Sequence, residues 1–265
     1  MRKTELGIVL FALLGLVGTV AWVVSSQLSA TAGSGKSGPL QSVMRLTPLR
    51  SGAGRSPRPA ARQDLAGRVI SKVNTGSKLV ALTFDDGPSP RLSKILALLE
   101  RHDARATFFT LTGRLAGQQM AVQDIVTQGS EVANHTSTHP RLESLSPGSI
   151  ESELRKSQEE IRQVLGRPSP YVRPSGCLTA PVAGVAKKLG VPVLMYSIDS
   201  GDGGREGAKA ISERVVRAAG PGEIILMHEN GRRTMEALPA ILSGLKAKGY
   251  GVVTVGELLA AGTVT

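Results

Sequence analysis

The sequence has little of three residue types, and each shortage is informative. Cys177 is the only cysteine among 265 residues, so an intramolecular disulfide framework is excluded. Aromatic residues make up 3% of the chain, which argues against a protein that stacks single-stranded nucleic acid on aromatic side chains. There are only four histidines, so two that occur close together are a notable candidate for a functional site. Hydrophobic residues nevertheless reach 41%, and a chain of this length buries a real core without disulfides.

Residues 6–24 form an apolar run without a charge, just after Arg2 and Lys3. A helix of that length nearly matches the hydrocarbon core of a bilayer and exceeds the usual apolar core of a cleavable signal peptide. The length favours an uncleaved anchor, whereas the small residues 30–32 offer a cleavage site for the alternative. The two basic residues favour a cytoplasmic N-terminus. We expect a single-pass protein of the cell membrane with its domain outside the cytoplasm, or a secreted protein if the segment is cleaved.

Residues 25–66 are rich in Gly, Pro, Ser and Arg and are predicted to be a disordered linker, because such a segment buries too little apolar surface to fold. Residues 1–66 hold 8 basic and 2 acidic groups, whereas the remainder holds 24 and 19, a net charge of only +5. A fold-wide basic surface is therefore not supported, and we expect no specific nucleic-acid partner. The chain divides into an anchor or signal segment (1–24), a linker (25–66) and a domain (67–265).

From residue 67 onward, short apolar runs alternate with amphipathic stretches. Seven runs are predicted strands: 78–84, 106–111, 130–135, 171–174, 192–198, 223–228 and 251–255. Six stretches are predicted helices: 91–101, 117–128, 147–165, 179–189, 207–218 and 233–248. Strands that alternate with helices indicate parallel βαβ units. About seven such units predict an α/β fold that approaches a closed barrel and falls one unit short of eight.

Two adjacent carboxylates, Asp85 and Asp86, directly follow the predicted strand 78–84. Such a pair at the end of a buried strand is costly unless a cation or a proton holds it. Asp-Gly-Pro is also good turn chemistry, so a turn in which an aspartate caps the next helix explains the pair equally well. Taken alone, the pair leaves both interpretations open.

His135 ends the predicted strand 130–135, and His139 follows at i+4. This spacing points two imidazoles to one side over a single turn, whereas a polar turn with two solvated histidines is the alternative. With Asp86 they make a set of two histidines and one carboxylate that leaves room for water. Such a set suits zinc at a hydrolytic site and non-heme iron in an oxygenase, so the ligands alone leave the metal open.

Further charged groups follow the next predicted strands along the chain. Arg173 comes first, then the stretch from Asp199 to Asp202, and then His228. The carboxyl ends of parallel strands meet at one edge, where barrel enzymes carry their active sites. This joint placement predicts a catalytic site there more firmly than any single motif does.

The order of these motifs resembles the polysaccharide deacetylase family, the NodB-homology group that is also carbohydrate esterase family 4. The resemblance covers roughly residues 67–262 and is carried by five segments: 83–88 (TFDDGP), 135–139 (HTSTH), 173–174 (RP), 199–202 (DSGD) and 226–228 (LMH). The first two motifs are highly specific when they occur together. The family implies a distorted (β/α) barrel, metal-dependent removal of acetyl groups, and an N-acetylated polysaccharide as substrate.

The resemblance assigns a divalent metal ion to Asp86, His135 and His139. Zinc is the expected ion, with cobalt, manganese, nickel or iron as alternatives. The resemblance also implies that Asp85 is the general base on metal-bound water. Arg173 would then sit against Asp85 and hold its charge and orientation.

For the leaving group, the resemblance implies that His228 is the general acid and that Asp202 pairs with it and keeps it cationic. A backbone N–H just after Arg173, near Ser175 or Gly176, would help to stabilise the oxyanion. This division agrees with the chemistry, because an amide is a poor electrophile and its amine leaves only when it is protonated.

Two positions depart from the family pattern. Residues 173–177 read RPSGC where the family usually has Arg-x-Pro, an aromatic residue and Gly, and Gly203 follows Asp202 where the family usually has tryptophan. Those aromatic residues commonly wall the acetyl pocket or the groove, so hydrogen bonds are expected to supply most sugar recognition here. Cys177, beside this loop, is expected to be a small buried residue rather than a ligand.

Three functions stay open at this level. The first is an N-deacetylase of an envelope or extracellular glycan, with the N-acetylglucosamine of peptidoglycan as the leading substrate and residues 6–24 as the membrane contact. The second is a catalytically degenerate glycan binder, which Ser175 and Gly203 favour. The third is an iron-dependent oxygenase, against which the barrel and the paired acid and base weigh. The intact charged set favours the enzyme, because a binder needs neither an acid nor a base.

Overall fold

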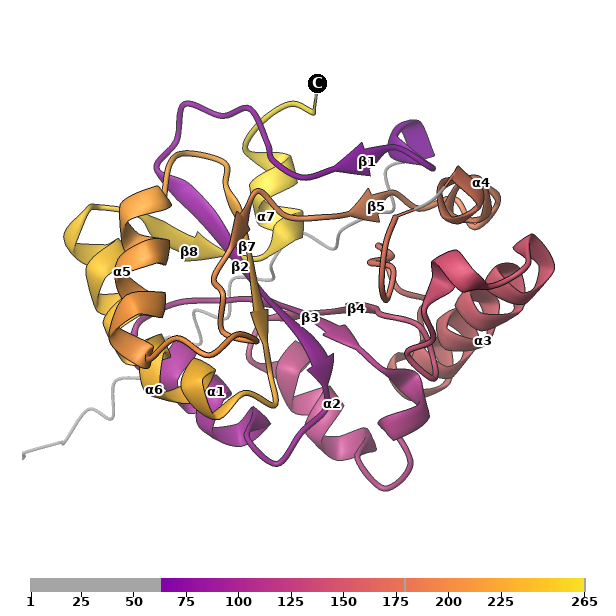
Figure 1. Ribbon diagram of the computed structural model, residues 1–265, viewed down its shortest axis with the longest axis horizontal. Coiled ribbons are helices and arrows are strands. Elements are labelled where there is room, and N and C mark those ends of the chain that lie inside the picture. The colour runs from indigo at the N-terminus through magenta and orange to yellow at the C-terminus, as the bar shows by residue number, and fades with distance from the viewer. Residues whose placement is uncertain (1–62, 179, 265) are drawn as a thin grey trace, which may run out of the picture. The chain divides into compact units, whose positions relative to one another are not determined.

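The computed structural model describes residues 63–178 and 180–264 (Figure 1). The predicted membrane segment and nearly all of the predicted linker lie outside these residues. Within the described part of the chain, no helix combines the length and the apolarity needed to cross a bilayer. The last residues assigned to the linker are ordered, since Gln63–Leu65 form a short 3-10 helix and Leu65 is buried in the domain.

The central strand is β2 (Leu79–Gly87), which is buried along almost its whole length. Successive residues of a strand point to opposite faces, so β2 serves two cores at once. Leu82 and Phe84 belong to the cluster packed under the helices. On the other face, Thr83 and Asp85 both accept hydrogen bonds from the buried Arg173. The alternation of β2 therefore sends Asp85 toward the interior at the end of the strand.

Parallel strands lie on both sides of β2, in the hydrogen-bonded order β4-β3-β2-β7-β6, and β8 pairs with the first residues of β2. Their bounds are β3 (Thr107–Thr110), β4 (Glu131–Asn134), β6 (Ile198–Asp199), β7 (Ile224–His228) and β8 (Gly251–Val253). A further parallel pair joins β1 (Val69–Ile70) to β5 (Val193–Leu194). The predicted α/β fold with parallel strands is confirmed.

The strand predicted at 171–174 is reduced to two isolated parallel bridges. Val172 pairs with Asn134 at the end of β4 and with Val193 of β5. Prolines stand on both sides, at 170 and 174, and a proline has no N–H to extend a ladder. The bridges still connect the central sheet to the β1–β5 pair.

The strand predicted at 192–198 is split into β5 and β6, because the chain changes its partner between them. The N–H of Met195 bonds to the carbonyl of Ile70 in β1, whereas the N–H of Ser197 bonds to the carbonyl of Ile224 in β7. This change of partner takes the chain from the β1–β5 pair back to β7 of the central sheet. β1 itself was missed, since two residues carry no periodic signal.

Six helices lie within one or two residues of their predicted ends: α1 (Leu92–Arg101), α2 (Gln119–Thr127), α3 (Pro147–Leu165), α4 (Ala180–Lys188), α5 (Ala208–Ala218) and α6 (Arg232–Ala247). The start of α3 shows why its bounds were readable. The hydroxyl of Ser146 accepts the N–H of Ser149, Pro147 occupies the first turn, and Gly166 ends the helix in the left-handed conformation with a φ of 70°.

A seventh helix, α7 (Val255–Ala260), was not predicted, and the strand predicted over 251–255 ends at Val253. Thr254 and Glu257 form a capping box, in which each side chain bonds to the backbone N–H of the other. This threonine and a glutamate three residues later were a readable signal for the helix.

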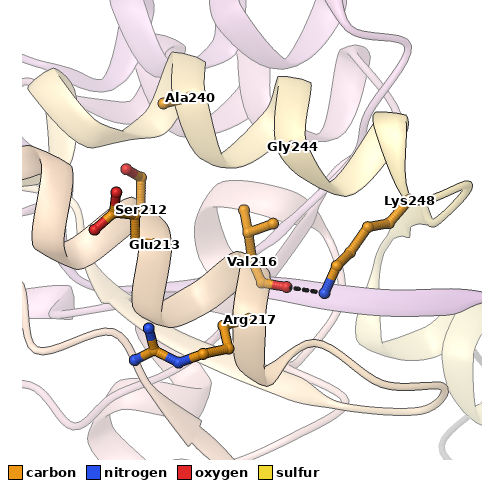
Figure 2. A pocket seen from close by; sticks show the side chains of 7 residues that line it. All are labelled: Ser212, Glu213, Val216, Arg217, Ala240, Gly244 and Lys248. Atoms are coloured by element: carbon orange, nitrogen blue, oxygen red, sulfur yellow. Dashed lines mark hydrogen bonds between the residues drawn. The ribbon is translucent and has the colours of Figure 1, made fainter.

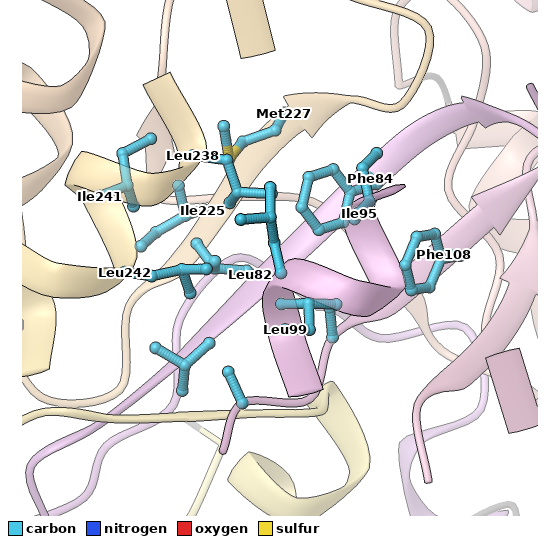
Figure 3. Close-up of a cluster of buried hydrophobic side chains, with 14 of the residues drawn as sticks. Leu82, Phe84, Ile95, Leu99, Phe108, Ile225, Met227, Leu238, Ile241 and Leu242 are labelled. Atoms are coloured by element: carbon cyan, nitrogen blue, oxygen red, sulfur yellow. The ribbon is translucent and has the colours of Figure 1, made fainter. Parts of the chain in front are cut away.

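The largest buried cluster packs α1 and α6 against the sheet (Figure 3). The rings of Phe84 and Phe108 stack with their centroids 5.2 Å apart. Burial on this scale is the main stabilising contribution to the fold. It also holds β2 and β7 in the register that pairs Asp85 with His228.

Candidate active site

The end of β2 brings two neighbouring carboxylates to one place. In a regular strand, Asp85 and Asp86 would point to opposite faces. Here the register with β3 shifts between Asp85 and Gly87, and Asp86 takes a left-handed backbone with a φ of 69°. As a result, Asp85 Oδ2 lies 3.6 Å and Asp86 Oδ1 lies 3.7 Å from His135 Nε2.

The loop that follows β4 brings the second histidine back to the first. Its backbone has positive φ at Thr136 (75°) and at His139 (61°). Together with Asp86, these are three of the four non-glycine residues with positive φ in the described chain. Such conformations are unfavourable for residues with a Cβ and concentrate at functional sites.

Asp86, His135 and His139 converge on one point. One ligand atom from each residue lies within 4.8 Å of the others, and His139 Nε2 is 3.3 Å from Asp86 Oδ1. Asp86 Oδ1 is buried and has no hydrogen-bond partner. A buried carboxylate oxygen without a partner is costly, and a cation removes that cost. The three residues therefore fit a divalent metal ion.

The protonation state of His135 also suits a metal ligand. Its Nδ1 lies 2.9 Å from the carbonyl oxygen of Arg173, so Nδ1 carries the proton and Nε2 turns a lone pair toward the two aspartates. Burial lowers the pKa of His135 below its ordinary value, although the neighbouring Asp85 acts in the opposite direction. The imidazole is thus neutral at neutral pH.

Asp85 is held by Arg173, which is almost completely buried. Arg173 Nη1 donates to Asp85 Oδ1 at 2.7 Å and to Thr83 Oγ1 at 2.8 Å. Its remaining donors bond to the carbonyls of Leu194 and Met195, both at 3.0 Å. The guanidinium therefore makes four hydrogen bonds within the fold, and it fixes one carboxylate oxygen while leaving the other toward His135.

His228 forms the other side of the site with Asp202. The ring Nδ1 of His228 lies 2.7 Å from Asp202 Oδ1. The other oxygen, Asp202 Oδ2, accepts hydrogen bonds from the backbone N–H of His228 at 2.7 Å and from the Thr234 hydroxyl. The hydrogen bond to Asp202 raises the pKa of His228 to about 9. Burial would raise the pKa of Asp202, but the bonds from His228 and Thr234 outweigh it and keep that pKa below its ordinary value.

All seven side chains predicted for the site thus lie together at the carboxyl edge of the strands. A sequence profile described as "Polysaccharide deacetylase" matches residues 72–194. Over 199 residues the chain is 33% identical to a peptidoglycan-N-acetylglucosamine deacetylase of Bacillus cereus, covering 73% of this chain and 93% of that one. The chain belongs to the polysaccharide deacetylase family.

The chain is also similar to a second deacetylase and to a pseudoenzyme of the family. The deacetylase PgdA of Listeria monocytogenes is 32% identical over 71% of this chain. The matched region makes up 40% of the length of PgdA. A CE4 family pseudoenzyme from Bacillus anthracis has a solved structure that is 31% identical and superposes with a TM-score of 0.69, covering 74% of this chain and 70% of that one. A mutant of that protein is described as having restored enzymatic activity.

The two departures from the deacetylase pattern take different structural roles. Ser175 is buried and donates its hydroxyl to the carbonyl of Pro140 at 2.6 Å, so it ties down the loop that carries His139. Gly203 is exposed, and a β-carbon placed on it would lie 3.7 Å from His228 Cε1. The glycine therefore leaves that side of His228 open. Cys177 is exposed, contrary to the expectation of a buried residue.

Glu229 of this deacetylase is fully buried directly after His228 and was not predicted as a site residue. Its Oε1 accepts the N–H of Ser89 at 2.6 Å, and its Oε2 lies so close to Gly87 that no side chain fits there. Burial raises the pKa of Glu229 to about 7. An acidic residue at the end of a buried strand was the available signal, and it was overshadowed by the histidine before it.

Arg114 was also missed. It follows β3 and donates a hydrogen bond from Nη1 to the carbonyl of Asp86, so it braces the turn that carries a predicted ligand.

A separate groove of about 540 Å³ lies between α5 and α6, with the Lys248 ammonium donating to the Val216 carbonyl at its edge (Figure 2). It contains none of the seven site residues and lies outside the active site.

Proposed function

We propose that this protein removes N-acetyl groups from a glycan of the cell envelope or its surroundings, with the N-acetylglucosamine of peptidoglycan as the leading substrate. Membership of the polysaccharide deacetylase family supports a hydrolase of this type, and the relative from Bacillus cereus bears that substrate in its name. The observation that carries the proposal is the convergence of Asp86, His135 and His139 beside Asp85 and His228.

Asp86, His135 and His139 would hold a divalent cation. When bound, such an ion polarises the amide carbonyl and, in the case of zinc, lowers the pKa of coordinated water from about 16 to about 7. We propose zinc because two imidazole nitrogens and one carboxylate match hydrolytic zinc sites, with cobalt, manganese, nickel or iron as alternatives.

Asp85 would accept the proton of the attacking water. Its Oδ1 is occupied by Arg173, whereas its Oδ2 faces the ligands. This arrangement leaves one carboxylate oxygen available for the proton and prevents the side chain from turning away. Arg173 acts here as a positioning residue, because it is buried and holds Asp85 while it also bonds to Thr83 and to the carbonyls of Leu194 and Met195.

His228 would donate the proton that the leaving nitrogen needs. With a pKa of about 9 it carries that proton at neutral pH. As the carbon–nitrogen bond breaks, the bonding pair goes to nitrogen and the proton moves from His228 Nε2 to it, giving acetate and a free amino sugar. Asp202 holds the opposite nitrogen of the ring and stabilises the cationic form.

The oxyanion of the tetrahedral intermediate would gain a hydrogen bond from the backbone after Arg173. In the described part of the chain, the N–H groups of Ser175 and Gly176 have no acceptor, whereas that of Cys177 bonds to Glu143. These free donors support the expected oxyanion contact. A strong donor of this kind stabilises the transition state by about 3 kcal/mol.

We place the catalytic domain outside the cytoplasm, tethered to the cell membrane by residues 6–24 or secreted after their removal. The apolar run and its basic start support this placement. Fractionation of cells that produce the full chain tests it: an anchored protein stays with the membranes and is degraded by external protease. Recovery of the whole chain in the cytoplasmic fraction would refute the placement.

The experiment that tests the activity is acetate release from peptidoglycan, chitin oligomers, poly-N-acetylglucosamine and acetylated xylan, each with and without chelator. We expect release from peptidoglycan that stops when the chelator removes the ion. Ser175, Gly203 and the similarity to a pseudoenzyme favour the second candidate, a glycan binder. Tight binding of a glycan without any acetate release, at saturating zinc, would establish the binder and reject the enzyme.

A further inference from the structure

Two glutamates of α3 reach the loop that carries His139. Glu153 and Glu160 are seven residues apart, about two helical turns, so they lie on one face of the helix. Glu153 Oε1 accepts the N–H of Ser137 at 2.8 Å, the N–H of Thr138, and the Thr138 hydroxyl at 3.0 Å. A single carboxylate oxygen therefore gathers three donors from the two residues before His139.

Glu160 joins the same loop to its neighbour. Its Oε2 accepts the Ser137 hydroxyl at 3.1 Å and the Thr112 hydroxyl. The backbones of the two loops also bond directly, from Thr112 N–H to the Thr136 carbonyl (3.1 Å) and from Gly113 N–H to the Ser137 carbonyl (2.9 Å). Helix α3 thus holds the loops after β3 and β4 as one unit.

The loop needs such support because its conformation is unfavourable on its own. Positive φ at Thr136 and at His139 is strained for both residue types, and strained backbone persists only where the surroundings over-determine it. On the side of α3 the loop borders a groove of about 600 Å³ whose lining includes Thr138 and Glu153. On this side, three hydrogen bonds to Glu153 hold the loop.

We propose that Glu153 is a positioning residue of the metal centre, which holds His139 in the ligand conformation before an ion binds and thereby sets the affinity for the ion. The inference rests on the proposed function, since it concerns the same metal site. Glu153 lies outside the ligand set of Asp86, His135 and His139 and acts through the backbone of residues 137–138.

Calorimetric titration of the full-length protein with zinc tests the proposal. We expect Glu153→Ala to weaken zinc binding by about 10- to 100-fold, the range usual for outer-shell partners of metal ligands. Glu153→Gln keeps the length and one acceptor oxygen but loses the charge, so it should fall between wild type and Glu153→Ala. The matched control is Glu159→Ala, which removes an exposed glutamate of the same helix that pairs with Arg162. The control should bind zinc as the wild type does.

A second readout separates positioning from a general loss of structure. The zinc concentration for half-maximal activity should rise in Glu153→Ala by the same factor as the dissociation constant. The kcat should return to the wild-type value at saturating zinc, and added zinc should not restore His139→Ala. Should Glu153→Ala fail to fold, Glu153→Gln carries both measurements.

Equal zinc affinity of wild type and Glu153→Ala, or of wild type and Glu153→Gln where only that variant folds, would overturn this inference alone. A lowered kcat that saturating zinc does not restore would also overturn it. A wild-type protein that binds no divalent ion would overturn the proposed function and this inference together.

Discussion

The carboxylates on the two sides of the active site differ in how completely they are satisfied. On the acid side both oxygens of Asp202 accept hydrogen bonds, one from the His228 ring and the other from the backbone N–H of His228 and the Thr234 hydroxyl. Across the site, Asp86 Oδ1 is buried without a hydrogen bond. The protein thus satisfies the carboxylate that holds the acid from its own atoms, whereas it leaves an oxygen of the predicted metal ligand Asp86 without a donor.

The backbone shows the same contrast. Positive φ at non-glycine residues occurs at Asp86, Thr136 and His139 on the metal side, whereas the acid side places its only left-handed residue at Gly201. Each such non-glycine conformation costs on the order of 1–3 kcal/mol. The strain of the site is thus concentrated where the binding of an ion can offset it.

The largest effect is expected when a ligand is removed. In Asp86→Ala or His139→Ala, two remaining ligands hold the ion poorly, so calorimetry should detect no zinc binding. The rise in melting temperature that zinc gives the wild type should vanish as well, because a ligand stabilises only the state that it binds. Unchanged zinc affinity in both variants would refute the ligand assignment and erase the contrast between the two sides.

Removing the base should leave the metal side intact and stop the chemistry. Asp85→Asn keeps the shape of the side chain but cannot accept a proton from water, so kcat should fall by about 100- to 10,000-fold. Zinc affinity, measured on the same sample, should stay close to that of the wild type. Full acetate release by this variant would show that Asp85 is not the base.

A smaller and pH-dependent effect is expected from Asp202→Asn. A general acid works only while it is protonated, so activity falls as the pH rises through the pKa of His228, which Asp202 raises to about 9. Without Asp202 the alkaline limb of the kcat/KM profile should move down toward the ordinary value of 6.5, with less change at pH 6. An alkaline limb that stays in place would remove His228 from the role of acid.

The same pair makes a pH-dependent contribution to stability. Because the folded pKa of His228 lies above its unfolded value, the pair stabilises the fold fully below about pH 6.5, and this contribution is lost as the pH rises through about 9. The difference in melting temperature between wild type and Asp202→Asn should therefore be smaller at pH 10 than at pH 6. A constant difference from pH 6 to pH 10 would contradict this expectation.

The smallest effect is expected at Thr234, whose hydroxyl supports Asp202 from α6. Thr234→Val keeps the shape and removes one donor, which should cost about 1 kcal/mol of folding stability. The alkaline limb should stay near its wild-type position, because the hydrogen bond between the His228 ring and Asp202 remains. A shift as large as that of Asp202→Asn would mean that Thr234, more than the imidazole, determines the state of that carboxylate.

Sequence patterns predicted the composition of the site well, because its residues follow the ends of strands that are readable as apolar runs. The sequence predicted that Asp85 and His228 lie at one edge of the strands, and the structure makes them register partners on β2 and β7. The bulge at Asp86 was not predictable, since no glycine or proline marks position 86 itself. Without the bulge, the alternation of a strand would have placed the two aspartates on opposite faces.

The parts that sequence did not predict depend on contacts distant along the chain. The break between β5 and β6 follows from a change of partner from β1 to β7, which leaves no trace in local periodicity. Glu153 and Glu160 look like ordinary charged residues of an amphipathic helix, and their contact with residues 112–138 exists only in the fold. By contrast, α7 and Glu229 had local signals that were overlooked, the first in its threonine and glutamate and the second in its place at the end of a buried strand.

The unequal exposure of the two histidines sets the route by which an ion would enter and leave. The side chain of His135 is 5% exposed and forms the floor of the site, whereas that of His139 is 46% exposed and stands at the rim. An ion held by these residues would reach solvent past the exposed His139, while His135 beneath it stays covered. Exchange of one ion for another would then not require the domain to unfold.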